Sequence, residues 1–250
     1  MKYLITGGTG TLGSALVKRL IKDHEVRVYS RDEYKQSEMM REIPEAQYWL
    51  GDVRDLDRLK NACQGVDVII HPAALKRMDT TSHNTYEVAD VNIRGTYNVC
   101  LAGEGKKIIH ISTDKVFQPS CIYGASKMIA ESIALANGAI VWRFGNFIGS
   151  RGSVWEIFAR QKAQGKPLTI TDPEATRFMM KIEDVCDYVL SEVGPGLHYP
   201  TNLTSMTIGQ IAKQVAPDSK WEIIGLREGE KLHESIAKEY ISADKIIPEL

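Results

Sequence analysis

The N-terminal segment places a glycine-rich turn between an apolar run and a helix-like stretch. Residues 2–6 (KYLIT) are typical of a buried strand, and GGTGTLG and then SALVKRLIK follow. In this context Gly7 permits a tight turn, Gly10 lets backbone amides approach a pyrophosphate, and Gly13 lets helix and strand pack closely. The helix N-terminus adds partial positive charge. The segment predicts a dinucleotide site made by Gly7, Thr9, Gly10, Thr11, Leu12 and Gly13.

The alternation of strand-like and helix-like runs continues along the chain. Further apolar runs lie at residues 25–29, 47–50, 66–70, from Ile108 onward, and at 138–143. Helix-like connections between such runs are typical of parallel strands joined by right-handed crossovers. The pattern predicts an α/β fold, a Rossmann-type doubly wound parallel sheet, whose ligands collect at the carboxyl ends of the strands.

Beyond residue 145 the pattern loosens into loops, helix candidates and short strands. We expect a cofactor-binding domain at 1–145, to which residues 178–203 return, and a small substrate-binding lobe at 146–177 and 204–250. A helix at 182–193 and an edge strand at 197–202 would make this return.

Composition excludes several classes of protein. A formal net charge of −1 over 250 residues gives no reason to expect nucleic acid or an anionic membrane as partner. The four cysteines form no CxxC pair and the six histidines show no metal-ligand spacing, which favours reduced core thiols and no metal site. No signal peptide and no apolar run of the roughly 18–20 residues that span a membrane are visible. We expect a cytoplasmic protein.

The end of the second strand bears on the choice of cofactor. Ser30 and Arg31, with Lys35 one helical turn on, suit a ribose 2′-phosphate and therefore favour NADP over NAD. Asp32 complicates this interpretation, unless it lies past the phosphate or pairs with a base. The alternative is an ordinary solvated charged turn.

Two later strand ends complete the expected cofactor contacts. Asp52 could meet the adenine amino group with Val53 packed on the ring, and the small side chains of Ala73 and Ala74 would let the cofactor pass. Asn92 either orients backbone or water near the site or is a buried, satisfied amide.

A cluster of ionisable residues follows the strand that begins at Ile108. Asp114, Lys115, Tyr123 and Lys127 lie within fourteen residues of one another. Tyr123 and Lys127 are four apart and share one face of a helix. A lysine ammonium beside the phenol would lower the pKa of the tyrosine from about 10, and the lysine can also bind the nicotinamide ribose.

The motifs GTGTLG, SRDEYKQSEM, GDVRD, AALK, STDK with YGASK, RFGNFIGSRGSV, TRF and REGEKLHE cover nearly the whole chain. With these the chain resembles the extended short-chain dehydrogenase/reductases, and within them the inverting UDP-N-acetylglucosamine 4,6-dehydratases of polysaccharide and flagellin-sugar biosynthesis. The lysine of STDK and the SRDExKQxEM run are the most specific to that subgroup.

The resemblance implies catalytic roles for Thr113, Asp114, Lys115, Tyr123 and Lys127. Tyr123 would take the proton of the sugar 4′-hydroxyl while hydride leaves C4′. Lys115, where retaining sugar dehydratases have glutamate, would remove the C5′ proton with inversion, and Asp114 would protonate the departing 6′-hydroxyl. A lysine base must be partly neutral, so we expect the pKa of Lys115 to be depressed from about 10.4.

The resemblance also implies that Lys76, Asn146, Arg177 and Arg227 contact the UDP-sugar, although each arginine could be a solvated surface charge. Two features depart from the pattern. The loop between Lys76 and Asn92 lacks the expected proline and glutamate, and the chain stops at Leu250 where relatives continue, which predicts a partly truncated lobe. Relatives usually assemble, so a homo-oligomer is expected.

Two other functions remain open at this level. The same fold and cofactor would serve a nucleotide-sugar epimerase or reductase, which shares Tyr123 and Lys127. A protein of another class, a non-catalytic NADP-binding regulatory protein, would keep the fold without the reaction. Asp114 beside Lys115 favours dehydration, because elimination needs both an acid and a base.

Overall fold

The computed structural model describes residues 1–77 and 83–247, and its largest element is a parallel sheet. Seven strands form the sheet in the order β10-β6-β5-β4-β1-β2-β3, and every neighbouring pair is parallel. The strands are β1 (Lys2–Thr6), β2 (Glu25–Ser30), β3 (Gln47–Leu50), β4 (Val68–His71), β5 (Lys107–Thr113), β6 (Ile140–Phe144) and β10 (Gly196–His198). The order reverses between β1 and β4, as in a doubly wound Rossmann fold.

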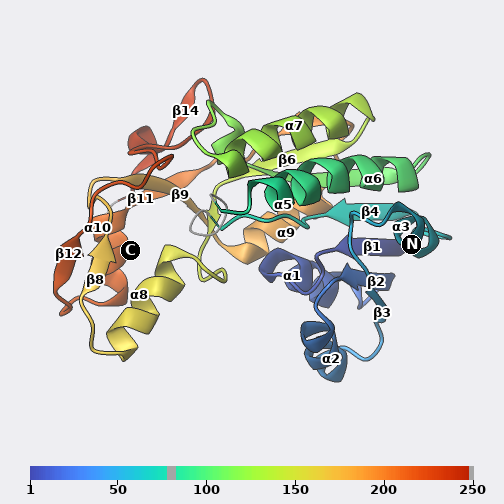
Figure 1. Cartoon of the computed structure of the whole chain (residues 1–250), viewed down its shortest axis with the longest axis horizontal. Coiled ribbons are helices and arrows are strands. Elements are labelled where there is room, and N and C mark those ends of the chain that lie inside the picture. The colour runs from blue at the N-terminus through green and yellow to red at the C-terminus, as the bar shows by residue number, and fades with distance from the viewer. Residues whose placement is uncertain (78–82, 248–250) are drawn as a thin grey trace.

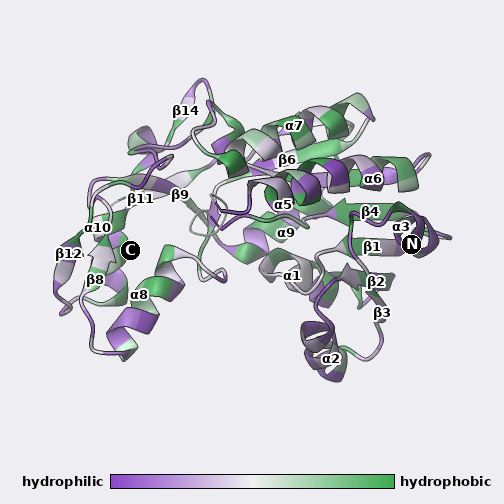
Figure 2. Cartoon of the chain, viewed as in Figure 1, coloured by the Kyte–Doolittle hydropathy of each residue, from purple (hydrophilic) through white to green (hydrophobic). Residues whose placement is uncertain are grey.

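Helices cover both faces of this sheet (Figure 1). One face carries α1 (Thr11–Leu20), α2 (Glu33–Glu42) and α9 (Ile182–Leu190). The other carries α3 (Leu56–Ala62), α6 (Gly95–Ala102) and α7 (Ile122–Ala136). The strands are therefore buried on both sides, which explains their nearly continuous apolar runs. Figure 2 shows most of β4 as hydrophobic, whereas most of α2 at the edge is hydrophilic.

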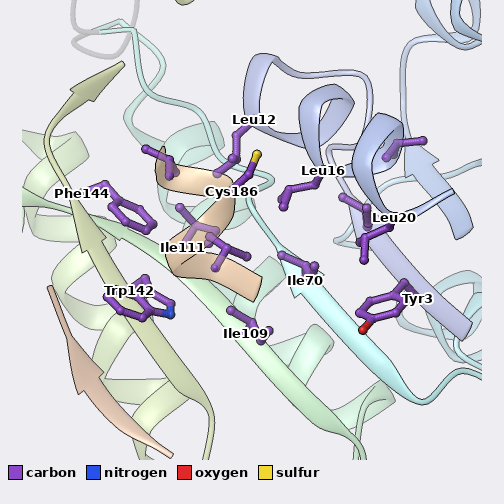
Figure 3. Packing of buried hydrophobic residues seen from close by; sticks show 14 of the residues in the cluster. Tyr3, Leu12, Leu16, Leu20, Ile70, Ile109, Ile111, Trp142, Phe144 and Cys186 are labelled. Carbon is purple, nitrogen blue, oxygen red and sulfur yellow. The ribbon is translucent and has the colours of Figure 1, made fainter. Parts of the chain in front are cut away.

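The core beneath α1 shows how the sequence period produces this packing. Leu12, Leu16 and Leu20 recur every four residues and are at most 5% exposed. In Figure 3 they point toward Ile70 and the side chains of the neighbouring strands. This contact fixes α1 against the sheet and holds its N-terminus at the carboxyl end of β1.

A smaller lobe follows β6. It contains a sheet of β7 (Asn146–Phe147), β9 (Thr176–Met180) and β11 (Thr204–Thr207) and a parallel pair of β8 (Leu168–Ile170) and β12 (Trp221–Ile223). Helices α8 (Val154–Ala163) and α10 (Ile208–Val215) pack on a core of their own around Phe158, Ile170 and Ile211. The chain then forms β13 (Ser235–Ala237), β14 (Tyr240–Ile241) and the 3-10 helix η3 (Ser242–Lys245). Figure 1 shows the lobe beside the carboxyl edge of the large sheet.

The strands and helices expected from the sequence are present with small shifts at their ends. The expected helix after Tyr86 consists of α5 (Thr85–Ala89), a π-helical turn η1 (Asp90–Arg94) and α6. The expected edge strand at 197–202 is confirmed at the edge of the sheet, but it is shorter, since Pro200 cannot continue the ladder. Among the described residues, no helix combines the length and apolar character of a membrane span.

Candidate active site

A cleft of about 1040 Å³ lies between the carboxyl ends of the parallel strands and the smaller lobe. Its wall includes residues that directly follow or end β1, β2, β3, β4, β5 and β6. Twenty of the predicted site residues line it: Gly7, Thr9, Gly10, Thr11, Leu12, Gly13, Ser30, Arg31, Lys35, Val53, Ala73, Ala74, Lys76, Thr113, Lys115, Tyr123, Lys127, Asn146, Arg177 and Arg227. Asp52 and Asp114 do not.

The glycine-rich turn has the geometry that a pyrophosphate requires. Gly7 has φ +60, and a Cβ at Gly13 would lie 2.4 Å from the Gly7 carbonyl oxygen, so neither position tolerates a side chain. No side chain caps α1, and its first turn carries no acidic residue. The first backbone N–H groups of α1 are therefore free to bind an anion. The residues present fit the pyrophosphate of a dinucleotide.

The cationic end of this cleft lies after β2. Ser30, Arg31, Asp32 and Lys35 line it together, and the Arg31 side chain is 47% exposed. The Asp32 carboxylate accepts a hydrogen bond from the Lys35 backbone N–H at 3.0 Å and pairs with the Lys35 ammonium. Asp32 therefore caps α2 and pairs with a base, as one of the two sequence interpretations expected.

Asp52 lies outside the cleft because Arg54 holds its carboxylate. The guanidinium of Arg54 donates from Nε at 3.1 Å and from Nη2 at 2.8 Å, and Arg31 lies 3.6 Å away. Val53 and Ala73 line the cleft, whereas Asp52, which directly precedes Val53 in the chain, does not.

Asn92 combines both roles that the sequence left open. Its side chain is 1% exposed, accepts from the Leu75 backbone N–H at 2.8 Å and donates to the Leu75 carbonyl at 3.0 Å. It also donates to Ser126 Oγ at 3.0 Å. Asn92 thus ties the segment after β4 to α7 from within the π-helical turn, a feature that often marks functional sites. Residues 78–82 of the divergent loop noted above lie outside the described residues.

The charged corner after β5 forms the 3-10 turn η2 (Asp114–Val116). Lys115 Nζ lies 3.0 Å from Asp114 Oδ1, and the Thr113 hydroxyl donates to the same oxygen at 2.9 Å. Asp114 is fully buried, behind the wall that Thr113 and Lys115 form. Its Oδ2 has no hydrogen-bond partner among the described residues. Burial first, and then the charge of Glu234, raise the pKa of Asp114 above its ordinary value.

A second carboxylate reaches this corner from far along the chain. Glu234 Oε1 lies 3.4 Å from Lys115 Nζ, and the residue is 4% exposed. Sequence reasoning assigned it no role, although it is the last residue of the REGEKLHE motif. The motif match was the available signal, but nothing in the spacing of 119 residues, from 115 to 234, indicated a contact.

The expected depression of the Lys115 pKa is wrong for this structure. Burial does oppose the charged form, but the carboxylates of Asp114 and Glu234 outweigh it and raise the pKa of Lys115 well above its ordinary value. At this site the charges of the two carboxylates stabilise the ammonium more than desolvation destabilises it. Lys115 is therefore held as a cation here.

The expected lowering of the Tyr123 pKa by Lys127 is also wrong. Burial raises the pKa of Tyr123 to about 12, opposed by the charge of Lys115 and by a hydrogen bond with Thr113. Lys127 Nζ instead donates to the Ile111 carbonyl at 2.6 Å and lies 3.0 Å from Nε2 of His110. Burial lowers the pKa of Lys127 to about 7. The i,i+4 spacing put both groups on the cleft wall without bringing their charges together.

Gly124 determines how closely α7 approaches the corner. A Cβ at this position would lie 2.3 Å from the Lys115 carbonyl oxygen, so only glycine lets the helix begin there. Its neighbour Tyr123 is thereby brought to the same wall as Lys115.

The predicted substrate contacts lie at the lobe side of the cleft. Asn146 lies on β7, and Arg177 on β9 is 7% exposed, bonded to Glu230 Oε1 at 2.9 Å and to the Leu232 carbonyl at 3.1 Å. Arg177 is therefore not a solvated surface charge, whereas Arg227 is exposed.

Further cations lie beside these contacts. Burial first, and then the like charges of Lys115 and Arg151, lower the pKa of Lys76. Arg151 also lines the cleft and donates to the Thr9 carbonyl in the glycine-rich turn. Sequence reasoning missed Arg151 as well. Local cations of this kind suit a diphosphate in a protein with almost no net charge.

Comparisons with known proteins show which family the chain is similar to. The family model described as polysaccharide biosynthesis protein matches residues 3–247. The inverting UDP-N-acetylglucosamine 4,6-dehydratase of Campylobacter jejuni is 40% identical over 252 residues, which cover 92% of this chain and 75% of that enzyme. The UDP-glucose 4-epimerase of Rickettsia conorii is 37% identical over 272 residues, covering 97% of this chain and 80% of the relative.

Solved structures extend the likeness to the fold. Pen from Bacillus thuringiensis superposes with a TM-score of 0.88 at 29% identity, over 93% of this chain and 79% of Pen. DesIV, a dTDP-glucose 4,6-dehydratase from Streptomyces venezuelae solved with NAD and TYD bound, superposes with a TM-score of 0.87 at 22% identity, over 95% of this chain and 88% of DesIV. At that identity the likeness to DesIV is one of fold.

The parallel sheet and the glycine-rich turn define a protein with a Rossmann-type fold. Within that fold class, the chain belongs to the polysaccharide biosynthesis protein family, as the match over residues 3–247 shows.

Proposed function

We propose that the protein is an NADP-dependent nucleotide-sugar 4,6-dehydratase that acts on UDP-N-acetylglucosamine and inverts C5′. The observation that carries the proposal is the corner at β5, where Lys115 lines the cleft and Asp114 lies 3.0 Å behind it. Elimination of water needs a base for the C5′ hydrogen and an acid for the 6′-hydroxyl. The 40% identity to the Campylobacter jejuni enzyme supports the same reaction.

The bound nicotinamide would supply a hydride acceptor for C4′ and a hydride donor for C6′. The chain's own residues handle the protons. Tyr123, as the phenolate, takes the proton of the 4′-hydroxyl, and the 4-keto group then acidifies the C5′ hydrogen. Because burial raises the pKa of Tyr123 to about 12, the phenolate is scarce near neutral pH and becomes more abundant as the pH rises. Lys115 accepts the C5′ hydrogen as a proton in its neutral form. Because its pKa is raised in this structure, the neutral amine is scarce near neutral pH, and C5′ exchange should become faster as the pH rises.

Asp114 supplies the proton for the departing 6′-hydroxyl, which leaves as water when the C6′–O bond breaks. Its neutral form is favoured because burial raises its pKa. Thr113 lines the cleft and its hydroxyl bonds to Asp114 Oδ1, so it connects the buried carboxyl with the substrate. It donates to Asp114 in this structure; to pass the proton on it must turn, accept the Asp114 proton and donate its own to the departing hydroxyl.

The substrate half of the proposal rests on Arg177 and Arg227 of the lobe and on Lys76, which follows β4. These three cations line the cleft together with Asn146. We place the UDP-sugar diphosphate among them. The division into a cofactor domain at 1–145 with 178–203 and a substrate lobe at 146–177 and 204–250 is part of the same proposal.

Incubation with UDP-N-acetylglucosamine and NADP in D₂O, followed by NMR of the sugar, tests the reaction. A 4-keto-6-deoxy product with inverted C5′ is expected. The 37% identity to the Rickettsia conorii UDP-glucose 4-epimerase makes C4′ epimerisation the second candidate. It would give the C4′ epimer with the 6′-hydroxyl retained and no deuterium at C5′, whereas deuterium at C5′ with the 6′-hydroxyl retained would indicate a C5′ epimerase.

The preference for NADP rests on Ser30, Arg31 and Lys35 at the edge of the cleft. Arg31→Ala should weaken NADP binding about 10-fold or more, because a hydrogen bond to a charged group contributes roughly 1.5–3 kcal/mol, and should leave NAD binding nearly unchanged. Calorimetric titration with each cofactor measures this. Equal losses for the two cofactors would contradict a 2′-phosphate contact.

A further inference from the structure

Glu234 is held rigidly against the active-site corner. Its backbone N–H donates to Ser242 Oγ at 2.9 Å, and the Ser242 N–H donates to the Glu234 carbonyl at 2.8 Å. β13, which begins at the next residue, packs against η2. The hairpin of β13, β14 and η3 thus delivers one buried carboxylate to Lys115.

Two carboxylates share the single ammonium of Lys115, at 3.0 Å from Asp114 and 3.4 Å from Glu234. Each carboxylate also has one buried oxygen without a hydrogen-bond partner among the described residues, Asp114 Oδ2 and Glu234 Oε2. A buried carboxylate that is not fully paired is costly, so one of the two groups is expected to keep a proton.

The surrounding charges decide which one. Lys231 Nζ lies 3.9 Å from Glu234 Oε2, and burial of Glu234 is outweighed by Lys115, Arg177 and Lys231, which lower its pKa. Around Asp114, Lys115 and the Thr113 hydroxyl act in that direction, but burial and Glu234 oppose them and its pKa is raised. Tyr123 on α7 and Lys76 after β4 also face the corner.

We propose that Glu234 is the counter-ion of Lys115 and thereby lets Asp114 hold the proton that the departing hydroxyl needs. This makes Glu234 a positioning residue, which acts through Lys115 and Asp114. The inference rests on the proposed dehydration for its catalytic consequence, but its electrostatic part can be measured without substrate.

The direct test is the titration of Asp114 by NMR in protein labelled with ¹³C at the aspartate carboxyls. Asp114→Asn assigns the resonance. In Glu234→Gln, Lys115 pairs with Asp114 alone and the repulsion from Glu234 is lost. The Asp114 midpoint should then fall by about one pH unit or more. An unchanged midpoint would overturn the proposal whatever reaction the protein catalyses.

The kinetic test separates the acid from the base. Glu234→Gln should slow formation of the 4-keto-6-deoxy product about 10-fold or more, because each pH unit by which the Asp114 midpoint falls lowers the protonated fraction of the general acid up to tenfold. C5′ exchange in D₂O should be unchanged or faster, since removal of Glu234 also removes a charge that raises the pKa of Lys115. A parallel loss of both rates would show a merely structural role and overturn the assignment.

Glu239→Gln is the matched control, because this glutamate is exposed on the same hairpin. It should leave both the Asp114 midpoint and the two rates at wild-type values. If the wild type formed no 4-keto-6-deoxy sugar, the proposed function would fail, while the Asp114 titration would still decide the role of Glu234.

Discussion

Lys115 and Lys127 lie on one cleft wall twelve residues apart in sequence, yet their surroundings differ in kind. Lys115 lies between two carboxylates, and its pKa is raised. Lys127 is 2% exposed with a carbonyl and a histidine as neighbours, and burial lowers its pKa to about 7. Burial of an ammonium therefore has opposite outcomes, depending on whether charged or neutral acceptors surround it.

The histidine beside Lys127 belongs to this contrast. His110 is fully buried, and burial first, followed by the charge of Lys127, lowers its pKa well below the ordinary value. It is neutral near neutral pH and accepts from Lys127 through Nε2. The hydrogen-bond partners of Lys127 are thus neutral, and the charge of Glu131, which pairs with Arg143, raises the Lys127 pKa less than burial lowers it. The Lys115 region is instead a compact ionic cluster.

Lys115→Met breaks the ionic side of the comparison and has the largest expected effect. C5′ exchange should fall on the order of 1000-fold, because the base is removed, while cofactor affinity is retained. Exchange in D₂O and calorimetry with NADP measure the two quantities. Lys127→Met is the matched variant at the second lysine site. A comparable loss of NADP affinity in Lys115→Met would make Lys115 a cofactor-binding or structural residue.

Lys127→Met tests, through the free energy of unfolding, whether burial neutralises Lys127. Between about pH 7 and 10 the unfolded chain binds a lysine proton that the folded chain lacks, since the folded pKa is lowered to about 7. The unfolding free energy of the wild type should therefore rise with pH, by up to about 1.4 kcal/mol per pH unit.

Urea denaturation at several pH values compares the wild type with Lys127→Met, which should lack this rise. Lys115→Met should keep it, because the folded pKa of Lys115 is raised rather than lowered. Identical pH dependence in the wild type and Lys127→Met would show that Lys127 is not neutralised by burial.

Thr113→Val sharpens the comparison of the two lysine sites, because it removes the hydroxyl that bonds to both Asp114 and Tyr123. The hydroxyl donates to Asp114 Oδ1 at 2.9 Å, and its hydrogen bond with Tyr123 lowers the tyrosine pKa. Loss of one hydrogen bond of about 1 kcal/mol predicts a decrease in kcat of roughly fivefold. The pH–rate profile should show the Tyr123 ionisation moved to higher pH. Thr171→Val, at the lobe side of the cleft, is the control and should leave that ionisation unmoved.

Most of the cofactor half was predictable because it depends on local rules. A strand, a turn that needs positive φ at Gly7 and an amphipathic α1 are each encoded in a few consecutive residues. Parallel order then follows from the helical connections, which places the strand ends together. Asp52 was the exception. Its carboxylate accepts hydrogen bonds from Arg54, and the residue does not line the cleft.

The charge state of the site was not predictable in the same way. The sequence identified Lys115, Asp114, Tyr123 and Lys127, but both pKa expectations were wrong. The interactions responsible come from Glu234 on the C-terminal hairpin, His110 on β5 and the burial of each group. No local pattern encodes these, because they arise only when distant segments pack.

By itself, the sequence determined the order of strands and helices, the glycine-rich turn and the four ionisable residues after β5. Local backbone preferences and hydrophobic periodicity suffice for these features. Only the tertiary structure decided that Lys115 lies between two carboxylates and that Lys127 has neutral hydrogen-bond partners. The reason is that a pKa depends on desolvation and on nearby charges in three dimensions, whatever their separation along the chain.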